Sequence, residues 1–170
     1  MGVALRDLTK KIKRPVRVAK VCLDGDLWAR YDELTAKLDA ATGQQGRGKM
    51  GETTEVRQLA EQVRAVEEAM RASEAAIEFR GISSFELAEI QARFPAKDGR
   101  GWDINAGAAA LIAACAVEKT SEEEAEEFLR SVNYAVSDKL FTAAWEATTG
   151  SSDVPFSARA SALIAASASK

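Results

Sequence analysis

The 170-residue sequence contains no histidine and only two cysteines. The lack of histidine removes the commonest general base and the commonest zinc ligand of proteins. Cys22 and Cys115 stand alone in apolar runs, so we expect each to be a buried free thiol rather than part of a metal-binding pair. No activated nucleophile or cofactor motif stands out. The sequence therefore predicts a protein that is not an enzyme and that needs no metal or other cofactor.

Long apolar runs are also missing from the sequence. A membrane-spanning helix needs about 20 consecutive apolar residues, and a secretory signal needs a basic stretch followed by a shorter apolar run. Neither pattern occurs. Together with the unpaired cysteines, this predicts a protein that is made and used in a reducing cytoplasm and does not enter a membrane.

The chain carries 23 basic and 26 acidic residues, and its net charge of -3 gives no overall nucleic-acid signature. Residues 1–14 are nevertheless predicted to form a basic N-terminal arm, with a short helix over residues 4–13. This arm is either a solvated terminus or a device that docks on an acidic partner or on nucleic acid. It has no aromatic side chain on which a base could stack, which argues against binding to nucleic acid.

Residues 15–82 are predicted to form a strand, a helical hairpin and a return strand. Residues 15–23 and 76–80 are the expected strands, and the hairpin helices are expected over 27–41 and 53–75. A helical hairpin brings the chain back to its starting end. The two strands should therefore run antiparallel and pair as a short ribbon at the base of the arm.

Both hairpin helices carry an apolar residue every three or four positions, which is the spacing of a heptad seam. The seam residues are Leu27, Tyr31, Leu34, Leu38 and Ala41 in the first helix and Val56, Leu59, Val63, Val66 and Met70 in the second. These seams can cover each other or a helix of another chain, and the sequence does not decide between the two arrangements. The candidate partner-binding residues are Leu34, Leu38, Leu59, Val63 and Val66.

The segment between the hairpin helices is rich in glycine and is predicted to be a linker. Gly43, Gly48 and Lys49 match part of the phosphate-binding loop pattern. However, Met50 occupies the position that should carry Ser or Thr, and the segment follows a helix rather than a strand. A linker is therefore favoured over a nucleotide site.

Residues 83–150 are predicted to form an alanine-rich helical head, followed by an Ala/Ser-rich flexible tail over 151–170. The expected N-caps are Asp26 for the first hairpin helix and, in the head, Ser83 or Ser84, Asp103 or Asn105, and Ser121 in a capping box with Glu124. Pro95, Val117 and Gly150 are the expected helix ends, and a last helix is expected from about 137 to 148. The expected core residues of the head are Phe85, Leu111, Phe141 and Trp145.

The fold class that follows is mostly α, with a helical hairpin arm and a small helical head joined by a short two-stranded antiparallel β ribbon. The stretch from Ile77 to Pro95 lies between the two halves, and we expect both halves to pack against it.

The order of features from Ile77 to Phe156 resembles that of the tail assembly chaperones of long-tailed phages that infect actinobacteria. The features are the IEFRGIS strand, a short helix ending at Pro95, a loop with Trp102, Asp103 and Asn105, and then the segments ALIAACAVE, SEEEAEEFL, DKLFTAAWEA and DVPF. The stretch VRVAKVCLDGDLWARYDEL adds a weaker similarity.

The resemblance implies a non-enzymatic role. Such chaperones bind the tape measure protein, keep its apolar helical surface soluble and help to recruit tail tube subunits. They act in the cytoplasm of the host cell and are absent from the mature virion. A longer product of ribosomal frameshifting usually accompanies them, and self-association into a homo-oligomer is compatible with the role.

An alternative function is that of a phage structural or packaging adaptor, such as a small terminase subunit that binds DNA. Such a protein also combines a basic N-terminus with helical hairpins. It would need a helix-turn-helix within the first fifty residues, where the sequence instead predicts a strand.

Overall fold

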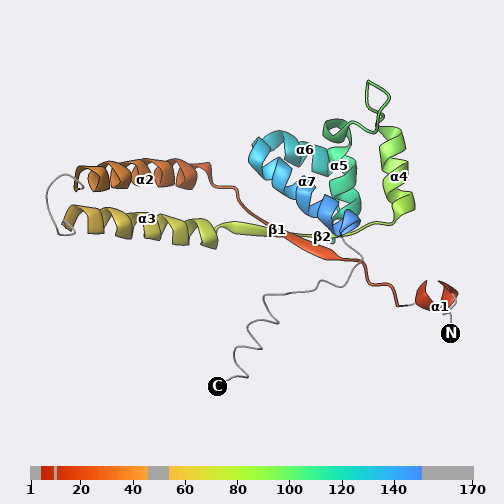
Figure 1. The fold of residues 1–170 in the computed structure, drawn as a ribbon, viewed down its shortest axis with the longest axis horizontal. Helices are drawn as coiled ribbons and strands as arrows, with labels where there is room; N and C mark the ends of the chain where they lie inside the picture. The colour runs from red at the N-terminus through yellow and green to blue at the C-terminus, as the bar shows by residue number, and fades with distance from the viewer. Residues whose placement is uncertain (1–4, 10, 46–53, 151–170) are drawn as a thin grey trace, which may run out of the picture.

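A computed structural model of the protein describes residues 5–9, 11–45 and 54–150 (Figure 1). Across these residues, seven helices accompany one antiparallel two-stranded sheet, which confirms the mostly α fold class. Two long helices lie side by side as an arm at one end of the sheet, and four helices pack together as a head (Figure 1). The predicted tail over 151–170 and the linker residues Gly48, Lys49 and Met50 lie outside the described residues.

The ribbon consists of β1 (Val16–Cys22) and β2 (Glu74–Arg80), with Val16 opposite Arg80 and Cys22 opposite Glu74. The predicted antiparallel pairing is confirmed. β2 begins two residues earlier than the predicted strand over 76–80, because Glu74 and Ala75 pair with Cys22 and Val21 at the end of β1. One face of the ribbon is buried against the head through Ala19, Val21 and Phe79.

The arm consists of α2 (Gly25–Gln45) and α3 (Thr54–Ala72). The predicted hairpin is confirmed, but α2 continues through Gly43, where the sequence indicated that the helix had ended. A single glycine costs a helix only about 1 kcal/mol, which the surrounding turns can outweigh. The predicted cap at Asp26 is wrong. Asp24 Oδ1 accepts hydrogen bonds from the backbone N–H of Asp26 at 3.0 Å and of Leu27 at 3.2 Å, so the helix begins earlier.

The N-terminal residues form the short helix α1 (Leu5–Thr9), which lies within the predicted range 4–13. The chain then reaches β1 through Arg14, whose Nη1 lies 3.2 Å from Glu86 Oε2 at the start of the head. This contact holds the base of the N-terminal segment beside the first helix of the head.

The head contains α4 (Ser84–Arg93), α5 (Ile104–Cys115), α6 (Glu122–Ser131) and α7 (Tyr134–Thr149). Helix α5 packs against the other three and against β2, which places it at the centre of the head, as its small side chains predicted. Helix α7 packs on both strands of the ribbon. The residues from Ile77 to Pro95 therefore join the ribbon to the head.

Helix ends in the head follow the predicted capping chemistry closely. Ser83 with Glu86 and Ser121 with Glu124 form complete capping boxes, and Asp103 caps α5.

Two helices of the head have other bounds than predicted. Helix α7 begins before the expected residue 137 because Asn133 Oδ1 accepts a hydrogen bond from Val136 N at 3.0 Å. Helix α5 ends at Cys115 rather than at Val117, since the Val117 N–H instead donates to the Glu78 carbonyl at 2.9 Å.

The predicted core is correct for Leu111, which is fully buried, and in part for Phe141 and Trp145. These two aromatic side chains are half-buried and stack on each other at a centroid distance of 6.1 Å. The prediction for Phe85 is wrong, because this side chain is 83% exposed. The Ser83 cap places Phe85 in the first turn of α4, and the helix packs on the core through Leu87 and Ile90 instead.

Gly81 allows α7 to approach the end of the ribbon closely. A Cβ atom at this position would lie 2.1 Å from the carbonyl oxygen of Ala147, which is far inside van der Waals contact. Glycine is therefore required at this position for packing as well as for ending the strand.

Two phenylalanines should respond very differently to truncation. Phe79→Ala removes a fully buried ring and should lower the free energy of unfolding by about 3–5 kcal/mol, whereas Phe85→Ala should change it by less than about 0.5 kcal/mol. Chemical denaturation followed by circular dichroism measures both. Equal destabilisation by the two variants would contradict the placement of α4.

The two free thiols should differ in reactivity. Burial raises the pKa of the Cys115 thiol, which is only 1% exposed, whereas Cys22 is half-buried beside the Ser73 hydroxyl. The prediction of a buried thiol is thus correct for Cys115 and only partly correct for Cys22. Iodoacetamide at neutral pH should alkylate Cys22 in the folded protein and Cys115 only in denaturant, as mass spectrometry would show. Labelling of Cys115 first would contradict this packing.

Candidate partner-binding surfaces

The seam residues of the arm lie between α2 and α3, which pack mainly against each other and stand away from the head (Figure 1). Among the candidate partner-binding residues, Leu34 and Val66 are buried, and Leu38, Leu59 and Val63 are half-buried. A partner helix can reach these side chains fully only if α2 and α3 separate. Their role in binding a partner stays a prediction.

The outer surface of the arm is charged. Pairs of opposite charge one helical turn apart lie along both helices, namely Glu33–Lys37, Arg57–Glu61 and Arg64–Glu68. The hydrogen bond from Lys37 lowers the pKa of Glu33. These exposed pairs make much of the outer surface of the arm polar, whereas Trp28 of α2 adds an apolar side chain that is 47% exposed.

The packing inside the arm is imperfect. The Thr35 hydroxyl is buried and has no hydrogen-bond partner, the only such side-chain atom found in the described part of the chain. An unsatisfied buried hydroxyl costs about 1–3 kcal/mol. A pair of helices that packs on little else, and that carries this cost, is expected to open more easily than the head.

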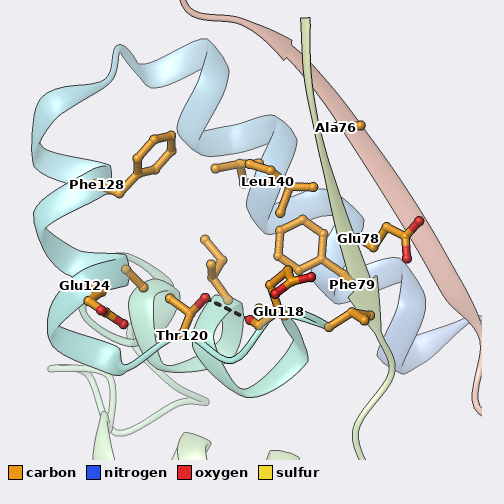
Figure 2. Close-up of a pocket in the computed structure, with 13 residues that line it drawn as sticks. Ala76, Glu78, Phe79, Glu118, Thr120, Glu124, Phe128 and Leu140 are labelled. Carbon is orange, nitrogen blue, oxygen red and sulfur yellow. Dashed lines mark hydrogen bonds between the residues drawn. The ribbon is translucent and has the colours of Figure 1, made fainter.

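A second surface, which the sequence did not predict, is a groove in the head with a volume of about 630 Å³ (Figure 2). It lies between β2, the segment after α5, helix α6 and helix α7. Phe79, Ile112, Ala125 and Leu140 are buried side chains that form its floor, and Phe128 is half-buried at one wall. Figure 2 shows Phe79, Phe128 and Leu140 around a common space. This groove, which we call the head groove, is therefore apolar inside.

The charged residues that line the head groove are all acidic, but Glu78 lines it through its backbone, because its side chain points away from the groove on the other side of β2 (Figure 2). The acidic side chains at the rim are therefore those of Glu118 and Glu124. Glu124 also completes the capping box of α6, where its carboxylate accepts a hydrogen bond from Ser121 N at 2.7 Å. The Thr120 hydroxyl donates to the Glu118 carbonyl at 3.0 Å and shapes the turn that carries the Glu118 side chain (Figure 2). A ligand with apolar and basic groups would match this combination of floor and rim.

One edge of β2 runs along the head groove. The hydrogen bond from Val117 N to the Glu78 carbonyl shows that Glu78 turns its peptide groups away from β1. In an antiparallel pair this orientation alternates along the strand, so the peptide groups of Ala76 face the same way. An extended peptide could thus pair with β2 beside Ala76 while its side chains enter the groove.

Two signals of the head groove were present in the sequence: the alternation of Ile77 with Phe79 and the acidic start of α6. What the sequence did not show is that the segment after α5 pairs with β2. The bridge between Phe79 and Ala116 brings these elements together. Without that tertiary contact, nothing in the sequence indicates that Phe79 and Glu118 line the same groove.

The described residues contain no group of three or more His, Cys, Asp or Glu side chains placed to hold a metal ion. None of the helices in that part of the chain combines the length and apolarity needed to cross a bilayer. No protein-family model, no curated protein and no solved structure matches this chain. The function is therefore argued from the two surfaces themselves.

Hydrogen exchange should distinguish the arm from the head. Amides of α2 and α3 should exchange faster than those of α5 and of the C-terminal half of α7, because the arm is stabilised mainly by its own seam. Mass spectrometry of the exchanging protein at neutral pH measures this difference. Equal protection of the arm and of α5 would contradict an arm that opens independently of the head.

Proposed function

We propose that this chain is a phage tail assembly chaperone that binds the tape measure protein and helps to recruit tail tube subunits. It would act in the host cytoplasm and would not remain in the mature virion. The resemblance from Ile77 to Phe156 supports this proposal at the level of sequence order. The observation that carries it is the arm, whose heptad seam is covered mainly by the two arm helices themselves.

A seam of this kind can exchange its partner. The tape measure protein is a long helical client whose apolar stripes need cover before the tube assembles around it. A client helix with heptad spacing presents the same apolar pattern to α3 as α2 does, so it can replace α2 at little net cost in buried apolar area. The chaperone would dissociate when the apolar stripe of the client packs against its permanent partner in the tail.

The head is suited to remain folded during this exchange. Its core, which includes Phe79, Leu111 and Leu140, is buried independently of the arm seam. Opening of the arm would therefore leave the ribbon and the head intact as a carrier. The head groove lies outside the arm and would keep its shape during the exchange.

Co-expression with a fragment of the tape measure protein tests the proposal. The chaperone should shift the fragment from the insoluble to the soluble fraction of the cell lysate and should co-purify with it. Replacing the half-buried seam residues Leu38, Leu59 and Val63 with serine should reduce the soluble fraction several-fold, because these side chains supply apolar cover to a client helix.

The matched control carries Lys37→Ala, Arg57→Ala and Arg64→Ala, which change exposed ion pairs on the same two helices and should leave client solubility unchanged. A fragment that stays insoluble with the wild-type chain would overturn the proposed function. A fragment that both variants solubilise equally would instead show that the arm seam is not the binding site.

A further inference from the structure

The N-terminal segment, defined as residues 5–9 and 11–14, presents apolar side chains that the rest of the described chain leaves wholly or partly exposed. Leu5 is 83% exposed, Ile12 is 66% exposed and Leu8 is 40% exposed. Basic residues are interleaved with them, including Arg6, Lys11 and Lys13. Such a segment combines an apolar surface with positive charge, and it matches a partner surface that is apolar and negatively charged.

The head groove is such a surface. Its floor is apolar, through Phe79, Ile112 and Leu140, and the charged side chains at its rim are those of Glu118 and Glu124. Among the remaining lining residues, Val117 is 40% exposed and adds apolar surface at the rim. The same chain thus carries two apolar surfaces of opposite charge, one basic and one acidic.

The N-terminal segment leads away from the groove of its own chain. Arg14 binds Glu86 at the start of α4, and Val16 pairs with Arg80 at the end of β2. The head groove follows β2 from Phe79 towards Ala76, in the opposite direction along the ribbon. Figure 1 shows α1 beyond the α4 end of the molecule, whereas α6 lies on the arm side of the head.

We infer that the N-terminal segment of one copy seats in the head groove of a second copy, so that chains associate head to tail. The contact is heterologous, since it joins two different surfaces, and it can therefore repeat from copy to copy. A segment this short buries less than the roughly 1,200 Å² of a standard interface, so the contact is weak and reversible. Its basic-to-acidic character makes it sensitive to salt.

This inference concerns self-association only and does not depend on the client proposed above. Sedimentation equilibrium of the full chain at low and high salt tests it. At low salt the average mass should rise above the 18.3 kDa of one chain as the protein concentration increases. At about 1 M salt, where charges are screened beyond about 3 Å, the mass should fall back towards one chain.

Two variants separate the two halves of the contact. The N-terminal variant carries Leu5→Asp and Ile12→Asp, and the groove variant carries Val117→Lys and Glu118→Lys. All four side chains are exposed, so the variants should keep the circular dichroism spectrum of the wild type. Each variant alone should remain a single chain. A control, Phe85→Asp, changes an exposed side chain on α4 and should associate like the wild type.

Mixing the two variants gives the decisive result. The groove variant keeps an intact N-terminal segment and the N-terminal variant keeps an intact groove, so the mixture should form a one-to-one complex that extends no further. A wild-type chain that stays single at about 1 mM in low salt would overturn the inference, because even a millimolar contact is detected there. Continued association of the N-terminal variant, or no complex in the mixture, would overturn it equally.

Discussion

The burial of Phe79 is the contact on which the rest of the structure depends. Its ring is fully buried in the head although it belongs to the ribbon, so it fixes the base of the arm to the core. Gly81 admits the Ala147 carbonyl at the end of the same strand, and the Val117 N–H binds the Glu78 carbonyl at its edge. These contacts orient β2, and β2 in turn sets the position of the arm and forms one wall of the head groove.

The two candidate surfaces differ in how they are made available. The arm keeps its apolar seam closed between α2 and α3 and surrounds it with exposed ion pairs. The head groove is open in the folded chain and carries acidic residues among its lining. A protein that must hold one partner temporarily while contacting another can use this division, because opening of the arm does not disturb the floor of the groove.

Local chemistry explains which parts of the fold could be predicted from sequence. Heptad spacing predicted the hairpin, alternation predicted the ribbon, and the Ser121–Glu124 pair predicted a capping box, since each signal acts within a few residues. The exposure of Phe85 and the existence of the head groove depend on contacts between distant segments, such as the bridge from Phe79 to Ala116. No short-range pattern contains that information, so the sequence could not supply it.

In the proposed function, a client reaches the seam only when α2 and α3 separate. A disulfide introduced between facing seam positions of the two helices, in a chain whose Cys22 and Cys115 are replaced by alanine, tests it most directly. The oxidised protein should fail to keep a tape measure fragment in solution, and reduction should restore this ability. Equal protection of the fragment by the oxidised and the reduced protein would contradict the claim.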